Sequence, residues 1–241
     1  MDIIRREITN TPPVTTVYVG TCLLLTILVQ MNILSPFQLY FNPTLIISKF
    51  QIWRIITSYC YFGNFSFNFL FNILFAYRYS RMLEENWYST KTADFVMLFL
   101  FCIIVTSIIL IQKVIAMFVQ IIFLSHVLTM MLVYVWSRRN PFVQLVIFGV
   151  INVTAPYLPW VFLAFQFLLG SNTLNDIMGI VVGHLYYFLE DVFPNQENGF
   201  RILRTPQFMK TLFNRHLNQA YNPLPEADRP GGFNWGEDGG H

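Results

Sequence analysis

The sequence predicts an all-α polytopic membrane protein: a bundle of six transmembrane helices with both termini in the cytosol. Three observations support this fold class. Hydrophobic residues make up 55% of the 241 positions, whereas charged residues make up only 12%, about half of the fraction that is usual in soluble domains. Apolar runs that approach the width of a bilayer recur six times. Basic residues gather on one side of these runs.

The chain begins with a short cytosolic segment, residues 1–16, in which isoleucines among charges predict an interfacial amphipathic stretch. The membrane domain covers residues 17–193. Residues 194–241 form a polar tail rich in proline and glycine, which we expect to be cytosolic and largely disordered. The six expected spans are residues 17–31, 65–79, 95–111, 117–136, 143–168 and 177–189.

The connection over residues 32–64 is too apolar for a solvated loop and too interrupted by proline for a span. We therefore expect it to lie in the membrane interface on the non-cytosolic side. It contains Trp53, which suits the headgroup region. The neighbouring Arg54 has up to five donors with which to hold loop carbonyls, so we interpret this pair as a structural anchor.

Charge placement predicts the orientation of the six spans. With the N-terminus in the cytosol, twelve Lys and Arg residues fall on the cytosolic side, and three fall on the other, namely Lys49, Arg54 and Lys113. Cytosolic loops of membrane proteins carry such an excess of basic residues. Both termini are therefore expected in the cytosol.

Three asparagines recur every four residues at the start of the second expected span: Asn64, Asn68 and Asn72. This spacing puts them on one face of a helix. Asparagine is costly against lipid, so the face should meet protein or water. Two interpretations stay open, a hydrogen-bonded seam between helices and the wall of a polar groove.

The sixth span combines polar and small residues. Thirteen residues separate Asp176 from Glu190, which corresponds to about 20 Å of helix, against a hydrocarbon core of about 30 Å. The charges lie in protected water, the bilayer is thinner here, or the headgroup level tilts around the protein. Gly179 and Gly183 permit a close helix contact. His184 is either a hydrogen-bonded packing residue or a proton-relay group.

No cofactor, metal or nucleic acid is expected from the sequence. The cysteines, Cys22, Cys60 and Cys102, lie far apart in apolar surroundings and are interpreted as small buried hydrophobes. The chain contains neither a Walker A loop nor an HExxH motif. Any directed pulling of another protein must therefore come from a partner.

Eight segments carry a family resemblance: residues 50–54 (FQIWR), 68–72 (NFLFN), 81–85 (RMLEE), 92–94 (TAD), 134–141 (YVWSRRNP), 157–160 (YLPW), 183–184 (GH) and 204–206 (RTP). Together they resemble the Derlins, from about residue 10 to the tail. Derlins are rhomboid-fold pseudoproteases of the endoplasmic reticulum (ER) membrane. The resemblance implies a role in retrotranslocation, in which misfolded lumenal and membrane proteins reach the cytosol for proteasomal degradation.

The resemblance also implies that the chain is not an enzyme. A rhomboid protease needs a Gly-x-Ser-Gly element in its fourth span, but Ser125 lacks the flanking glycines. The protease histidine lies three residues before the first glycine of the sixth-span pair, and Asp176 occupies that position here. With nucleophile and base both absent, an intramembrane protease with unusual residues is the disfavoured alternative.

The implied site is a polar groove in a locally thinned membrane, lined or supported by Asn64, Asn68, Asn72, Asp176 and His184. The implied partners are misfolded ER proteins, a membrane ubiquitin ligase complex, a cytosolic AAA ATPase, the lipid bilayer and further copies or relatives of the chain. One alternative is a client receptor that links misfolded proteins to the ligase and the ATPase without forming a conduit. Another is a small-solute channel.

The tail resembles the box through which Derlins recruit the ATPase, which combines an aromatic residue, glycines and a closing leucine. Phe233, Trp235, Gly236 and Gly239 match this pattern. The closing leucine is missing, which weakens the case for direct binding of the ATPase.

Overall fold

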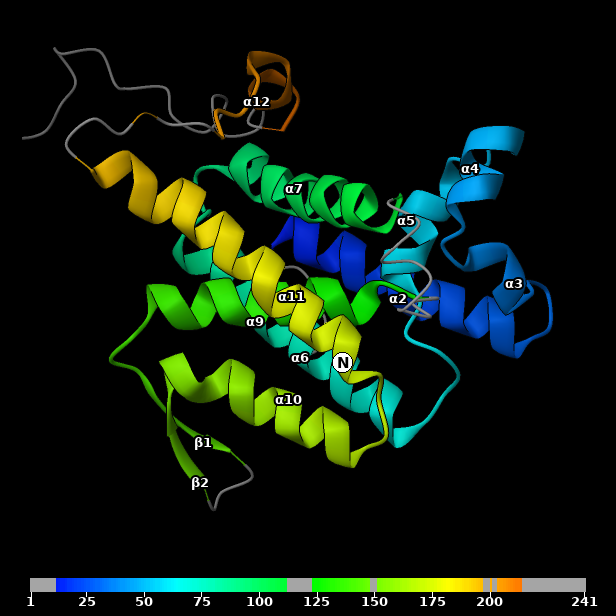
Figure 1. Cartoon of the computed structure of the whole chain (residues 1–241), viewed down its shortest axis with the longest axis horizontal. Coiled ribbons are helices and arrows are strands. Elements are labelled where there is room, and N and C mark those ends of the chain that lie inside the picture. Colours follow the sequence, from blue (N-terminus) through cyan, green and yellow to red (C-terminus); the bar gives the residue numbers. More distant parts are fainter. Residues whose placement is uncertain (1–11, 112–122, 148–150, 197–199, 201–202, 214–241) are drawn as a thin grey trace, which may run out of the picture.

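The computed structural model describes residues 12–111, 123–147, 151–196, 200 and 203–213, and these residues are mostly helical (Figure 1). Residues 1–11 and 112–122, which include the start of the fourth expected span, lie outside the described residues. So do the tail positions Phe233, Trp235, Gly236 and Gly239.

Within the described residues, six helices build the bundle (Figure 1): α2 (Pro13–Gln30), α6 (Phe67–Asn86), α7 (Thr92–Ile111), α9 (Ser125–Arg139), α10 (Leu158–Leu168) and α11 (Thr173–Tyr187). Of the described helices, α2 and α7 are each long and apolar enough to cross a membrane by themselves. The number of spans and the side on which the termini lie stay predictions.

Three short helices form the connection after α2: α3 (Pro36–Leu39), α4 (Pro43–Lys49) and α5 (Trp53–Cys60). Proline stands at the first position of α3 and α4, where the missing N–H costs nothing. Asn42 caps α4 by accepting hydrogen bonds from the backbone N–H groups of Thr44 and Leu45. Figure 1 shows α3 near the end of α2, whereas α5 lies alongside α2 and packs against it.

Glu84 joins the end of α6 to the start of α2. Its buried carboxylate accepts hydrogen bonds from the N–H groups of Val14 at 3.0 Å and Thr15 at 2.8 Å, and from the Thr15 hydroxyl at 2.7 Å. An N-terminal helical turn has free N–H groups and favours a negative charge. The start of α2 therefore lies beside the end of α6.

Four arginines mark this same end of the bundle, two on α6 and two in the last turn of α9: Arg78, Arg81, Arg138 and Arg139. We call it the arginine end. The helices α2, α7 and α10 begin at this end, whereas α6, α9 and α11 finish there.

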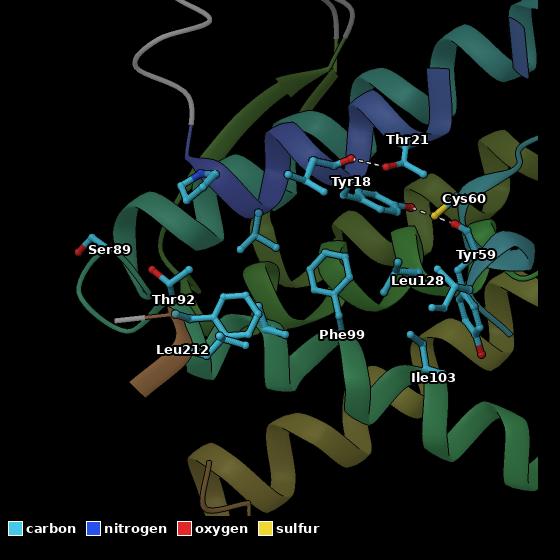
Figure 2. Close-up of a pocket in the computed structure, with 16 residues that line it drawn as sticks. Tyr18, Thr21, Tyr59, Cys60, Ser89, Thr92, Phe99, Ile103, Leu128 and Leu212 are labelled. Carbon is cyan, nitrogen blue, oxygen red and sulfur yellow. Dashed lines mark hydrogen bonds between the residues drawn. The ribbon is translucent and has the colours of Figure 1, made fainter. Parts of the chain in front are cut away.

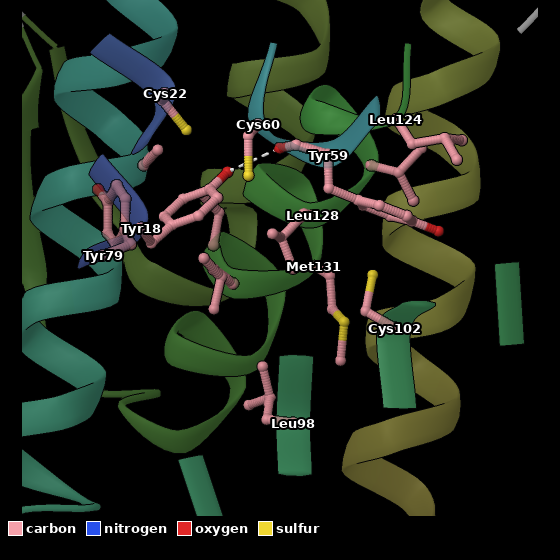
Figure 3. Close-up of a cluster of buried hydrophobic side chains, with 14 of the residues drawn as sticks. Tyr18, Cys22, Tyr59, Cys60, Tyr79, Leu98, Cys102, Leu124, Leu128 and Met131 are labelled. Atoms are coloured by element: carbon pink, nitrogen blue, oxygen red, sulfur yellow. Dashed lines mark hydrogen bonds between the residues drawn. The ribbon is translucent and has the colours of Figure 1, made fainter. Parts of the chain in front are cut away.

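The centre of the bundle is α9, in which every residue from Val127 to Ser137 is buried. It packs against α5, α6, α10 and α11. The main core cluster around it includes the three cysteines, which are free of disulfides (Figure 3). Figure 3 shows Cys22 and Cys60 near Tyr18, with Cys102 nearer to Met131.

The closest helix crossing lies between α9 and α11, at the two glycines of α11. A Cβ atom added to Gly179 would lie 2.5 Å from the Cβ of Met130 and 2.6 Å from the carbonyl oxygen of Val127. A Cβ on Gly183 would lie 3.0 Å from the Cβ of Tyr134. Glycine at both positions lets the helices approach this closely.

The prediction of a helical span over residues 143–168 is wrong for its first half. Two antiparallel strands, β1 (Gln144–Ile147) and β2 (Ile151–Thr154), are followed by a 3₁₀ turn, Ala155–Tyr157, and α10 has only 11 residues. Valine, isoleucine and threonine dominate this stretch and favour strands. Pro156 and Pro159 then prevent a helix from extending backwards.

Two further expectations need correction. Asn64 does not belong to the second helix, because α6 begins at Phe67 with Ser66 as its capping residue. The sixth helix is not limited to residues 177–189. It begins at Thr173, and helical turns continue through Phe188–Val192 and Phe193–Asn195. The interval between Asp176 and Glu190 therefore does not measure the length of this helix.

The short helix α10 packs mostly through a small second core cluster, while Leu158 at its start belongs to the main cluster. This second cluster consists of Phe71, Met130, Tyr134, Phe162 and Ile180. It is separate from the main cluster around α9. The helix α10 therefore attaches to the side of the bundle, as Figure 1 also shows.

Candidate functional site

Four polar side chains join α6 to α10 in a closed ring of hydrogen bonds, which we call the polar joint: Asn68, Asn72, Gln166 and Ser171. Asn68 donates to the Ser171 hydroxyl at 2.8 Å, and Asn72 donates to Asn68 Oδ1 at 2.7 Å. Gln166 donates to Asn72 Oδ1, and Ser171 closes the ring by donating to Gln166 Oε1 at 2.9 Å. The polar joint lies opposite the arginine end.

The polar joint is buried at its centre, where Asn72 is 1% exposed and Gln166 is 0% exposed. A buried amide must find hydrogen-bond partners, because an unsatisfied one costs about 1–3 kcal/mol. Each amide in the ring finds them on the neighbouring side chain. The asparagines and their partners thus form a hydrogen-bonded seam in this conformation.

Sequence reasoning found half of the polar joint. It included Asn64, which is exposed and accepts a hydrogen bond from the Tyr61 hydroxyl at 3.0 Å instead. It missed Gln166 and Ser171. A signal for Gln166 existed, since it is the one amide side chain within the otherwise apolar sequence of α10. An isolated amide in such a run predicts a polar partner.

A layer of phenylalanines continues the α6–α10 contact toward the arginine end. The ring centroids of Phe71 and Phe165 lie 4.5 Å apart, those of Phe71 and Phe162 lie 5.2 Å apart, and those of Phe75 and Phe162 lie 4.4 Å apart. The two helices are joined by these side chains rather than by close backbone packing. The joint therefore depends on rotatable groups.

The other two residues of the expected groove lie apart from the polar joint. Asp176 is 1% exposed, and its Oδ2 atom finds no hydrogen-bond partner within the described part of the chain. His184 is exposed near the arginine end, with Nδ1 2.7 Å from the Tyr134 hydroxyl. Neither residue is hydrogen-bonded to the ring.

Ser125 and His184 have separate partners. Ser125 is buried at the start of α9 and donates to the carbonyl oxygen of Tyr61 at 2.8 Å. His184 bonds to Tyr134, more than two helical turns further along α9. A serine nucleophile requires a base within hydrogen-bond reach, and the described contacts do not place one beside Ser125.

Arg54 holds the connection after α2 together. Its Nη1 donates to the carbonyl oxygens of Phe37 at 2.8 Å and Tyr40 at 3.1 Å, and its Nε donates to Gln51 Oε1 at 2.6 Å. The guanidinium also lies 5.0 Å from the centre of the Tyr40 ring. Trp53 beside it is 54% exposed, which leaves its ring available to the surrounding medium.

A charged network closes the arginine end. Arg139 binds both carboxylate oxygens of Asp191, at 2.9 and 3.1 Å, and donates to the Tyr88 hydroxyl at 2.8 Å. Tyr88 in turn contacts the Tyr186 hydroxyl at 2.9 Å. Burial raises the pKa of Tyr88, while the charge of Arg139 opposes the rise. The network ties α9, α11 and the loop after α6 into one unit.

An apolar crevice of about 730 Å³ separates α2 from α7 (Figure 2). Tyr18 and Thr21 line it from α2, and Phe99 and Ile103 line it from α7 (Figure 2). At the arginine end it meets the short helix α12 (Gln207–Phe213), which packs on α7 and contributes Leu212. Of the side chains that the structure describes, no Asp, Glu, Lys, Arg or His lines the crevice.

No group of three or more potential metal-ligating side chains lies together among the described residues. The polar joint and the crevice instead offer neutral amides, hydroxyls and apolar surface.

The family profile and the relatives that match this chain point to the same protein family. The sequence profile of the Der1-like family matches residues 11–207. Derlin-2.1 of Zea mays is 44% identical over 207 residues, which cover 84% of this chain and 83% of the relative. Derlin-2.2 of Arabidopsis thaliana is 42% identical, with 84% of each chain covered. A probable derlin-2 homolog of Dictyostelium discoideum is 35% identical, with 84% and 80% covered. This chain therefore belongs to the Der1-like family, the Derlins.

Proposed function

We propose that this chain resides in the ER membrane and assists retrotranslocation of misfolded proteins to the cytosol, with the polar joint as the place where α6 and α10 part to admit polar polypeptide. Membership of the Derlin family implies a role in ER-associated degradation. The single observation that carries the proposed mechanism is the closed amide ring buried between two helices that otherwise touch through side chains.

The ring suits such a role because its hydrogen bonds are exchangeable. The amides of Asn68, Asn72 and Gln166 resemble peptide groups, so each can trade a ring partner for the backbone of a passing chain. In the closed state the ring satisfies these groups, which avoids leaving polar atoms against lipid. Opening requires side chains to rotate but leaves the backbones of α6 and α10 intact.

Local thinning of the membrane is supported by α10 rather than by α11. The 11 residues of α10 span about 17 Å, well below a hydrocarbon core of about 30 Å. A bilayer that meets a short hydrophobic segment thins around it. Asp176 does not support thinning, because its carboxyl is enclosed by protein.

Partners follow from this proposal. The chain has no ATPase motif, so a cytosolic AAA ATPase supplies the pulling force and a membrane ubiquitin ligase marks the client. The client receptor without a conduit is the second candidate. It is favoured by exposed apolar side chains on the connection after α2, where Phe37 and Phe50 are each 78% exposed.

A double substitution tests the polar joint. Asn72→Leu with Gln166→Leu replaces both buried amides by apolar groups of similar size. Asn68 and Ser171 are only partly buried and keep the hydrogen bond between them. We expect the double variant to fold. In a pulse-chase assay, cells that carry it should degrade a misfolded lumenal client several-fold more slowly than cells with the wild-type chain. Thr26→Val, which removes a buried hydroxyl from α2, is the matched control. Unchanged degradation in the double variant would contradict the proposed passage.

Site-specific photocrosslinking separates the conduit from the receptor. A crosslinking residue at Phe67, one turn before Phe71 on α6, probes the α6–α10 joint. The same residue at Phe37 probes the connection after α2, and Ile104 on α7 serves as an exposed control. A stalled client should crosslink at Phe67 and not at Ile104. Crosslinks confined to Phe37 would support the receptor instead.

A further inference from the structure

We propose that a pocket at the arginine end, between α9, α10 and α11, binds the phosphate of a membrane phospholipid. The pocket has a volume of about 390 Å³ and is lined by Tyr134, Arg138, Pro156, Trp160, Ile180, Val181 and His184. This volume lies within the range of about 300–1,000 Å³ that ligand pockets usually occupy. The inference does not depend on the proposed retrotranslocation role.

Cationic and neutral donors converge on the pocket. Arg138 is exposed in the last turn of α9 and makes no ion pair with a carboxylate within the described ranges. Its guanidinium lies 5.6 Å from the centre of the Tyr187 ring. Stacking on a ring face leaves the N–H edge of a guanidinium available, and that edge matches the oxygens of a phosphate.

His184 adds a second donor with a defined orientation. Its Nδ1 lies 2.7 Å from the Tyr134 hydroxyl, and the two rings meet edge to face. When Tyr134 donates to Nδ1, the ring proton stays on Nε2. Nε2 has no other partner among the described contacts and is then a donor for a phosphate oxygen.

The rest of the pocket suits the remainder of a lipid. Trp160 is 58% exposed at the start of α10, and tryptophan favours the headgroup level of a membrane. Val181, 57% exposed one turn before Leu185, continues the wall along α11 away from the arginines. A phosphate at Arg138 and His184 therefore leaves the glycerol and an acyl chain against apolar surface. A free inorganic phosphate would use the donors but not this wall.

The position of the pocket fits the same ligand. Arg138 and His184 lie in the last turns of α9 and α11, and Trp160 lies in the first turn of α10. These turns mark the headgroup level of any bilayer that surrounds the bundle. The concave site joins three helices, so a bound lipid also bridges α10 to the α9–α11 pair.

Lipid binding by the purified full chain in mild detergent tests the proposal. Native mass spectrometry is used while phosphatidylserine, or neutral diacylglycerol with the same acyl chains, is added. We expect the wild-type chain to retain phosphatidylserine and not diacylglycerol. Arg138→Gln should weaken retention about tenfold to a hundredfold, the scale of losing a charge-assisted hydrogen bond. Arg78→Gln, which changes another exposed arginine at the same end but outside the pocket, should leave retention unchanged.

A second variant keeps the charges and fills the wall. Val181→Trp occupies the apolar part of the pocket and should also lower phosphatidylserine retention, while the melting temperature confirms that both variants fold. Three results would overturn the proposal. They are equal losses in Arg138→Gln and Arg78→Gln, equal retention of diacylglycerol and phosphatidylserine, and displacement of the lipid by an equal concentration of inorganic phosphate.

Discussion

Replacing Gly179 by alanine should destabilise the bundle at its closest helix crossing. The added Cβ would lie 2.5 Å from the Cβ of Met130 and 2.6 Å from the carbonyl oxygen of Val127. Neither atom can rotate away, because one is fixed to the α9 backbone and the other belongs to it. The helices α9 and α11 must therefore separate by several tenths of an ångström along their length.

The size of the effect follows from this geometry. Overpacking of a tight interior costs about 1–3 kcal/mol. On the scale of domains of 150–250 residues, where 1 kcal/mol shifts the melting temperature by about 2–4 °C, Gly179→Ala should melt roughly 2–12 °C lower. Thermal unfolding of the purified protein in detergent, followed by tryptophan fluorescence, measures this shift.

Two other glycines provide graded controls. The three atoms nearest to a Cβ at Gly183 belong to the Tyr134 side chain, at 3.0–3.2 Å. These contacts are longer than the 2.5 and 2.6 Å contacts at Gly179, so Gly183→Ala should cost less. A Cβ at Gly20 in α2 would meet nothing within 4 Å. Gly20→Ala should be neutral or stabilising by up to about 1 kcal/mol. If Gly179→Ala melts at the same temperature as Gly20→Ala, the α9–α11 crossing is not as close as described.

Three more predictions concern the contacts that order the rest of the chain. Glu84→Ala removes the buried cap of α2 and should destabilise the protein by about 3 kcal/mol in the same unfolding assay, whereas Glu85→Ala on the exposed side should have little effect; equal shifts would exclude the cap. Arg54→Lys has one donor nitrogen in place of the separate Nε and Nη1, so amide exchange in residues 37–40 should rise at least about tenfold, and unchanged exchange would show that the guanidinium does not order this segment. Thr205→Val removes the hydroxyl that donates to Asp94 and should make exchange in α12 about fivefold faster; a protected α12 would mean that another contact holds it.

The long apolar helices could be predicted from the sequence because hydropathy alone determines them. The expected spans near residues 17–31 and 95–111 correspond to α2 and α7. The prediction was wrong where an apolar run is compatible with either a membrane-spanning helix or a β-hairpin. The run before Pro156 is as hydrophobic as a span, yet it forms the β1–β2 hairpin, since β-branched residues and proline oppose a helix there.

The polar joint could be predicted only in part. Spacing of four residues correctly placed Asn68 and Asn72 on one face of α6. Their partners come from a helix that is nearly 100 positions away, as in the bond from Gln166 to Asn72. No periodicity in a single sequence encodes such a pairing. Asn64 fits the spacing equally well, but the capping residue Ser66 starts the helix after it.

The separate packing of α10 has a consequence for how the bundle comes apart. Phe162 of α10 belongs to the small second cluster, and only Leu158, at the start of the helix, belongs to the main one. Loss of α10 beyond its first turn therefore leaves most of the cysteine-containing interior intact. Regions with few buried contacts open at a lower free energy than the whole molecule. Gradual heating or denaturant should thus release this helix as a first, reversible step, and the protein would exist briefly as a five-helix remnant that still keeps its shape.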